Sequence, residues 1–133
     1  MSSISSSRDL ASDPSVDLAR ELRRNNSEVI SAFVVDGAGR VRGADAQSPD
    51  ITAAAVALVV PARELLDRVA GELGCGAIRT FFLEGDRASI AFADVDGSST
   101  AIVVGQSSAA PGALRADAVL LARRSAAQET WPS

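Results

Sequence analysis

The sequence predicts an α/β fold: a five-stranded, mainly antiparallel sheet with a long helix on one face and the terminal helices on the other. Five extended apolar runs, separated by turns that contain glycine or aspartate, indicate the strands. A long helical run stands between the second and third of these strands. Several strands carry large side chains on both faces, which requires helices to cover the sheet front and back.

The length of 133 residues suits a single domain, which we expect to span residues 13–127. Serine dominates residues 1–12, so this segment is predicted to be a disordered tail. Residues 128–133 are predicted to form a loose C-terminal tail. No secretory signal is visible, and the most apolar segment, Ile51–Val60, is shorter than the roughly 20 residues that span a bilayer. We therefore expect a cytoplasmic protein without membrane insertion.

The charged residues exclude several classes of function. The net charge is −4 and the arginines are scattered, whereas nucleic-acid binding needs a clustered basic face. The chain contains neither histidine nor lysine, so the bases that activate a nucleophile in most hydrolases are missing. The single cysteine, Cys75, is expected to be at least half-buried and cannot hold a metal alone. The composition predicts a non-enzymatic protein with no cofactor and no nucleic-acid partner.

The first half of the chain predicts a helix followed by a hairpin. The helix is expected to begin at Pro14 and to end at Asn25-Asn26. The strand Val29–Val35 is apolar on both faces and is expected inside the sheet. Residues 36–39 have the sequence Asp-Gly-Ala-Gly, which favours a tight hairpin turn. The return strand, Arg40–Ala44, alternates valine with arginine and is expected near a sheet edge.

The long helix is predicted from Pro49 to Leu73, with Ser48 as its cap. Its first half, Ala53–Val60, is apolar on every side, so it needs a partner besides its own sheet. Pro61 is expected to kink the helix, because the proline nitrogen cannot donate a hydrogen bond.

Three strands and a helix complete the chain. The strands are predicted at Ala77–Glu84, Ala88–Ala93 and Ser99–Gly105, and the helix at Pro111–Ala127. The last helix is expected to bury Leu114, Ala118, Leu121 and Ala122 and to expose Asp117 and Arg124.

Two loops resemble ligand-binding motifs. The glycines of residues 36–39 occur in phosphate loops as well as in hairpins, but a phosphate loop leads into a helix, so the hairpin is favoured. Residues 94–97, Asp-Val-Asp-Gly, resemble the start of a calcium loop but lack its later acidic ligand. A plain turn is favoured, with Asp94 and Asp96 facing solvent.

Several segments share their order and spacing with a known family. They are the strand and turn Ala32–Val41, the helix end at Leu73-Gly74, the strands Ile78–Leu83, Ala88–Phe92 and Ala101–Val104, and the entry to the last helix at Ala110–Arg115. Their arrangement over residues 13–124 resembles the Roadblock (dynein light chain-like) family. Pro61 inside the long helix departs from the family pattern.

The resemblance implies a homodimer, in which the long helices pack together and the strand after the long helix pairs with its twin. Bacterial members of the family are typically partners or regulators of a Ras-like small GTPase, so the resemblance implies such a partner, with Arg63 and Arg68 as possible rim charges. The dimer interface is expected to contain Leu58, Ala62, Leu65, Leu66 and Val69 on the helix and Ile78, Thr80 and Phe82 on the strand.

An alternative from another class is a small-ligand sensor domain in a signalling system, since profilin- and PAS-like folds share a helix-flanked antiparallel sheet. Such a sensor needs a pocket with converging polar groups. The sequence offers few buried polar candidates beyond Ser31 and Thr80.

Overall fold

The computed structural model describes residues 14–46 and 49–129. The predicted Ser-rich tail at residues 1–12 and the chain from residue 130 onward lie outside the described residues. The described elements, in order, are α2 (Pro14–Asn25), β1 (Val29–Val35), β2 (Val41–Ala46), α3 (Pro49–Glu72), β3 (Thr80–Glu84), β4 (Ala88–Asp94), β5 (Thr100–Gln106) and α4 (Pro111–Glu129). No helix in this part of the chain has both the length and the apolar character needed to cross a membrane.

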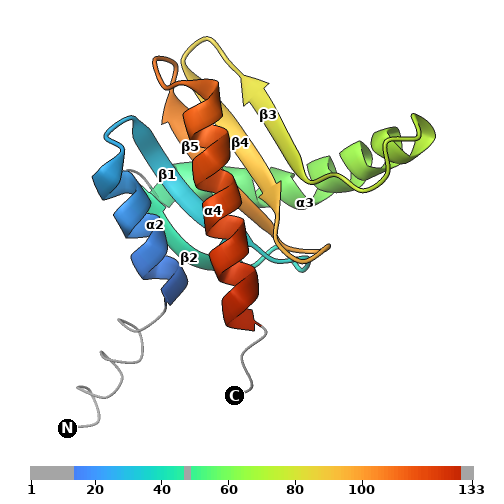
Figure 1. Cartoon of the computed structure of the whole chain (residues 1–133), viewed down its shortest axis with the longest axis horizontal. Helices are drawn as coiled ribbons and strands as arrows, with labels where there is room; N and C mark the ends of the chain where they lie inside the picture. The colour runs from blue at the N-terminus through green and yellow to red at the C-terminus, as the bar shows by residue number, and fades with distance from the viewer. Residues whose placement is uncertain (1–13, 47–48, 130–133) are drawn as a thin grey trace, which may run out of the picture.

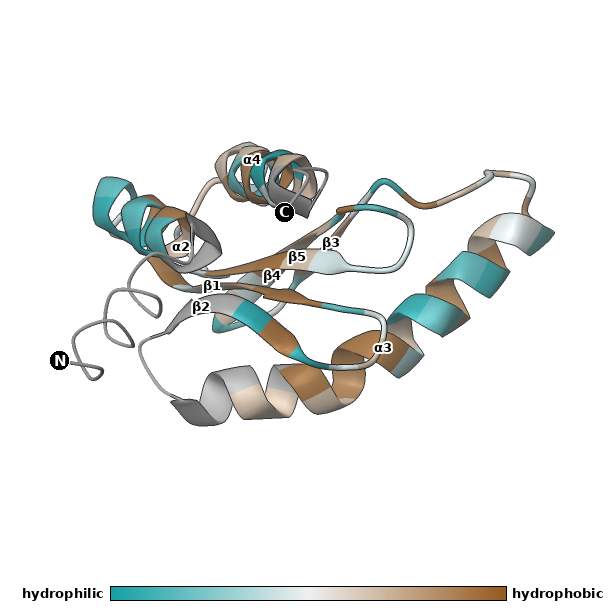
Figure 2. Ribbon diagram, turned by 90° about the horizontal axis from the view of Figure 1, so that it is seen from below, coloured by the Kyte–Doolittle hydropathy of each residue, from teal (hydrophilic) through white to brown (hydrophobic). Residues whose placement is uncertain are grey.

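The strands form one sheet in the order β2-β1-β5-β4-β3, and all neighbouring strands are antiparallel. The two edge strands are therefore β2 and β3. Helices α2 and α4 lie on one face of the sheet and α3 lies on the other (Figure 1, Figure 2). This arrangement confirms the predicted fold class and the predicted edge position of the return strand.

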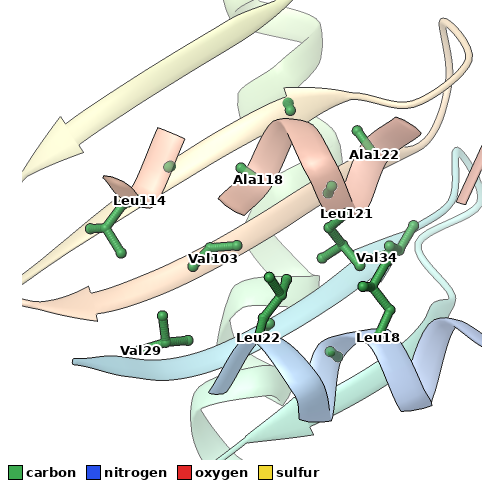
Figure 3. Packing of buried hydrophobic residues seen from close by; sticks show 14 of the residues in the cluster. Leu18, Leu22, Val29, Val34, Val103, Leu114, Ala118, Leu121 and Ala122 are labelled. Atoms are coloured by element: carbon green, nitrogen blue, oxygen red, sulfur yellow. The ribbon is translucent and has the colours of Figure 1, made fainter. Parts of the chain in front are cut away.

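The larger part of the core lies between the sheet and helices α2 and α4 (Figure 3). Val34 of β1 and Val103 of β5 are buried at this interface. The residues that α2 and α4 contribute are those at helical spacing, because such residues share one helix face. They are Leu18, Ala19 and Leu22 from α2 and Leu114, Ala118, Leu121 and Ala122 from α4.

The opposite face of the sheet is covered only in part. Val59 of α3 packs with Phe33, Val35 and Ile102, and the helix contacts mainly β1 and β2. The second half of α3 extends past the edge strand β3 and beyond the sheet (Figure 1). The helix is unbroken at Pro61, but its axis changes direction between its two halves (Figure 2), in line with the expected kink.

The start of β3 differs from the sequence prediction. The strand begins at Thr80 and not at Ala77, so Ile78 precedes it. Gly74 and Gly76 adopt positive φ angles of 73° and 81°, which end α3 in a loop before the chain returns to the sheet.

Two other boundaries also shift. The return strand β2 spans Val41–Ala46 instead of Arg40–Ala44. Helix α4 continues to Glu129, so the beginning of the predicted C-terminal tail, residues 128–129, is helical.

Candidate protein-protein interface

Helix α3 presents a row of apolar side chains to solvent. On the helix, Leu58 is 67% exposed, Leu65 59% and Val69 45%, and Leu73, in the turn directly after the helix, is 74% exposed. These residues recur at helical spacing, so they form one continuous stripe beside the face that meets the sheet. Single exposed leucines are ordinary, whereas a contiguous apolar stripe marks an interaction surface.

The edge strand β3 lies beside this stripe and pairs only with β4 among the described strands. Its free edge carries unpaired backbone donors and acceptors, which can take up a further strand. Its residues alternate between the two faces of the sheet. Leu83, on the α3 face, pairs with Ile90 of β4 and is 49% exposed. Phe82 is half-buried on the other face, against the core of α2 and α4.

The predicted interface residues therefore divide into two groups. The outward-facing group on α3 consists of Leu58, Ala62, Leu65 and Val69. The half-buried group consists of Leu66, Ile78, Thr80 and Phe82. Sequence reasoning left out Leu73 and Leu83, although Leu73 continues the helical spacing of the first group.

A small cavity of about 30 Å³ lies between the middle of α3 and strands β3 and β4. Leu66, Ile78, Phe81 and Phe92 belong to its mainly apolar lining. Its volume suits about one water molecule, far below the roughly 300–1,000 Å³ of a small-molecule site. This cavity is therefore too small to be the ligand site of the alternative prediction, a small-ligand sensor domain.

Arg63 is bound within the chain and is not a free rim charge. Its Nη1 donates to the carbonyl oxygen of Ser99 at 2.8 Å and to Oγ1 of Thr100 at 2.9 Å. Its Nη2 pairs with the carboxylate of Asp94, and its Nε lies 3.7 Å from a carboxylate oxygen of Asp67. Only 17% of the side chain is exposed. Arg63 therefore ties α3 to the loop between β4 and β5.

The predicted solvent-facing position of Asp94 is wrong in part, because this carboxylate pairs with Arg63 and is 27% exposed. Both of its oxygens also accept the backbone N–H of Gly97. Arg68, the other predicted rim charge, is exposed on α3.

The hairpin between β1 and β2 confirms the turn reading of residues 36–39. Asp36 Oδ1 accepts the backbone N–H groups of Ala38 and Arg40, each at 2.9 Å, and Gly39 adopts a φ of 83°. The backbone hydrogen bond from Arg40 is the main cause that lowers the pKa of Asp36 below its ordinary value of 3.8. The Asp36 carboxylate is thus occupied in shaping the turn.

The loop after β4 is likewise a turn. Asp96 Oδ1 accepts the backbone N–H groups of Ser98 at 3.1 Å and of Ser99 at 2.8 Å. The described residues contain no cluster of three or more acidic, histidine or cysteine side chains that could hold a metal ion. Cys75 is exposed and not half-buried as predicted, because it lies in the loop between Gly74 and Gly76.

Solved structures share this architecture. MglB from Myxococcus xanthus superposes with a TM-score of 0.78 at 16% identity, over 87% of this chain and 94% of that one. A Roadblock/LC7 domain from Streptomyces avermitilis gives a TM-score of 0.78 at 17% identity, over 87% and 98%. An MglB in a tetrameric arrangement gives 0.77 at 18% identity, over 86% of each chain.

No protein-family model and no curated protein matches the sequence. The first two superpositions each cover 87% of this chain and more than nine-tenths of the matched chain. The chain has the Roadblock/LC7 fold.

Proposed function

We propose that this chain is a homodimeric, non-enzymatic binding module that regulates or scaffolds a Ras-like small GTPase. The observation that carries the proposal is the exposed apolar stripe of α3 beside the free edge of β3. The GTPase partner follows from the resemblance to the Roadblock family, whose bacterial members typically act with such proteins.

Two apolar surfaces of one copy are exposed to solvent, and a second copy buries each of them in the proposed dimer. The second half of α3 projects beyond its own sheet (Figure 1). Leu65 and Val69 in this half are exposed, as is Leu73 directly after the helix. The part of the sheet near Leu83 is exposed on the α3 face. Full burial of one leucine or valine side chain contributes about 1.5–3 kcal/mol, so burial of the stripe in both copies favours a dimer.

A dimer also protects β3. When the free edges of two β3 strands pair, their backbone groups satisfy one another and no edge remains on that side of the sheet. The MglB structure in a tetrameric arrangement shows that a protein of this fold self-associates, which supports the proposal by analogy.

Regulation of a GTPase requires that the dimer bind one nucleotide state more tightly than the other. The groove beside the paired α3 helices is the proposed seat of the GTPase, with the exposed Arg68 at its rim. Arg63 contributes indirectly, because it holds the β4–β5 loop against α3.

The first experiment measures self-association by sedimentation velocity at micromolar concentration. Leu65→Asp is expected to give a folded monomer, because it places a charge in the centre of the stripe. Leu120→Asp is the matched control, since Leu120 is an exposed leucine (38%) on α4, away from the stripe. A parent chain that sediments as a stable monomer rejects the homodimer.

The second experiment tests the partner. Immobilised dimer is incubated with a Ras-like small GTPase from the same genome, loaded with GDP or with a non-hydrolysable GTP analogue. Retention of one nucleotide state several-fold above the other is expected. Equal or absent retention of both states for every such GTPase rejects the regulatory role.

A further inference from the structure

The layer formed by helices α2 and α4 carries exposed arginines on its outer side. Arg115, Arg123 and Arg124 are exposed on α4, and Arg24 is exposed at the end of α2. Both helices cover the same face of the sheet (Figure 2), so arginines that are far apart in the sequence share one side of the molecule. We call these four residues the arginine surface.

The arginine surface extends along α4. Asn26 Nδ2 donates a hydrogen bond to Asp117 Oδ2 at 3.3 Å, which places the end of α2 beside the beginning of α4. Arg24 and Arg115 each lie two residues from one of these partners, so they belong to the same end of the layer. Arg123 follows Arg115 by eight residues, which is about 12 Å further along the helix axis. The surface therefore covers more than two turns of helix.

The chain does not neutralise this positive charge. None of the four arginines forms an ion pair with an acidic residue of the described ranges, 14–46 and 49–129. The one acidic residue of α4 between positions 111 and 127, Asp117, is half-buried. On α2, Asp17 pairs with Arg20 at 4.0 Å, which leaves Glu21 as the other exposed carboxylate. The whole chain carries a charge of −4, so this surface is a local exception.

Apolar side chains lie between the arginines of α4. Leu120 is 38% exposed, and Ala116 and Ala127 are exposed as well. These three residues and Arg123 follow one another at steps of three and four residues, so they share the outward face of the helix. A helix face with both arginine and apolar residues suits the boundary between lipid headgroups and acyl chains, where the apolar stem and the charged end of arginine are both accommodated.

The shape of the surface favours an extended anionic partner. The outer side of a helix is convex, so it cannot enclose a small ligand as a pocket does. A bilayer with anionic lipids presents a flat and continuous array of phosphates, which a row of arginines can contact at any spacing. Guanidinium groups also bind phosphate oxygens with two hydrogen bonds at once. Clusters of about four to eight basic residues on a helix are typical of such lipid contacts.

We propose that the arginine surface is a peripheral docking site for an anionic lipid bilayer, with its four guanidinium groups on the headgroup phosphates. The contact is superficial and requires no helix to cross the membrane. The surface lies on the opposite face of the sheet from α3 (Figure 2), so a chain bound in this way keeps the apolar stripe of α3 accessible. The inference goes beyond the proposed function and does not depend on it.

Vesicle flotation with the full chain tests the docking site. The probes are vesicles of phosphatidylcholine alone and vesicles in which about one-third of the lipid is phosphatidylglycerol. The chain is expected to float with the anionic vesicles only. The bound fraction should fall several-fold when the salt concentration is raised from about 0.05 M to about 0.5 M, because salt screens the attraction between exposed charges.

A pair of double variants locates the surface. Arg123→Gln combined with Arg124→Gln is expected to lower the partition onto anionic vesicles roughly tenfold. Arg79→Gln combined with Arg87→Gln is the matched control, because it changes the net charge equally at two exposed arginines outside α2 and α4. This control should bind as the parent does. Glutamine is a good helix former, and circular dichroism checks that both variants are folded.

The outcomes are distinct. A parent chain that does not float with anionic vesicles overturns the proposal. Equal losses in the two double variants show attraction by net charge alone and also overturn it. Polyglutamate and duplex DNA are added as competitors at the same concentration of negative charge as the vesicles. Release of the parent from the vesicles by either competitor assigns the surface to an acidic protein or to nucleic acid and overturns the lipid assignment, whereas retention on the vesicles supports it.

Discussion

Arg63 on α3 and Asp94 at the end of β4 form an ion pair that ties the long helix to the β4–β5 loop. The same guanidinium donates to Ser99 and Thr100, so the loop is held at three points. A mostly buried arginine with several acceptors stabilises a fold more than an exposed pair does, because water screens its charge less and its hydrogen bonds are charge-assisted.

Replacement of Arg63 by leucine is expected to lower the free energy of unfolding by about 1–3 kcal/mol, because Asp94 and the Ser99 carbonyl each lose a charged donor. Arg68→Leu is the control, since Arg68 is exposed on the same helix, and its effect should stay within about 0.5 kcal/mol. Urea unfolding followed by circular dichroism measures both. Equal effects of the two substitutions would contradict the role assigned to Arg63.

Gly105 on β5 gives a second prediction, because it lies directly beneath α4. A Cβ atom at this glycine would lie 2.6 Å from Cδ2 and 2.8 Å from Cδ1 of Leu114, whose side chain is fully buried. Gly105→Ala is therefore expected to overpack the core and to cost about 1–3 kcal/mol.

Gly112→Ala provides the comparison, because an added Cβ at Gly112 meets no atom within 4 Å. This exposed glycine lies in the first turn of α4, where alanine favours the helix, so the variant should keep or raise the melting temperature. Differential scanning calorimetry distinguishes the two variants. A Gly105→Ala variant that melts with the parent would show that Leu114 moves aside freely.

A third prediction concerns pH and Asp117. Burial is the main cause that raises the pKa of Asp117 above its ordinary value of 3.8, while the 3.3 Å hydrogen bond from Asn26 Nδ2 acts in the opposite direction. In the interval just above pH 3.8 the folded chain therefore holds a proton that the unfolded chain has lost. The contribution of Asp117 to stability must fall as the pH rises through this interval.

The measurement is the difference in free energy of unfolding between the parent and Asp117→Asn, recorded from about pH 3 to about pH 7 around the ordinary carboxyl pKa. This difference should decrease with rising pH and become constant near neutrality. Asp36→Asn is the matched control, because the pKa of Asp36 is shifted in the opposite direction. Because the pKa of Asp36 is lowered, its contribution is present above pH 3.8 and is lost on acidification. If both differences rose with pH, the assignment of Asp117 would be refuted, and if both fell, the assignment of Asp36 would be refuted.

The sequence predicts the fold well because the signals that define it are local. The Asp-Gly-Ala-Gly turn has the glycine that its φ of 83° requires, and the alternation of residues in β4 matches its alternating burial. The helical spacing of Leu114, Ala118 and Leu121 identifies the buried face of α4 correctly. Each of these signals depends only on residues that are close to one another in the sequence.

The positions of polar side chains are predicted less well, because they depend on contacts between distant segments. Asp117 is expected at the surface, yet it is half-buried beside Asn26 at the end of α2. Arg63 belongs to a polar run of α3, and nothing within the helix indicates that a loop far along the chain supplies its acceptors. Likewise Phe82 and Leu83 are adjacent apolar residues, and only the arrangement of the layers determines which of them meets the core.

The last prediction uses these two neighbouring residues to distinguish an effect on the stability of the monomer from an effect on self-association. Phe82→Asp places a charge against the core of α2 and α4, so it is expected to destabilise the monomer itself, by up to about 3 kcal/mol for a half-buried phenylalanine. Leu83→Asp places the charge on the exposed α3 face of β3, so it should leave the monomer folded and weaken only its self-association. Circular dichroism melts report the first effect, and sedimentation velocity reports the second. If Leu83→Asp remained a dimer as tight as the parent, the α3 face of β3 would be excluded from the interface.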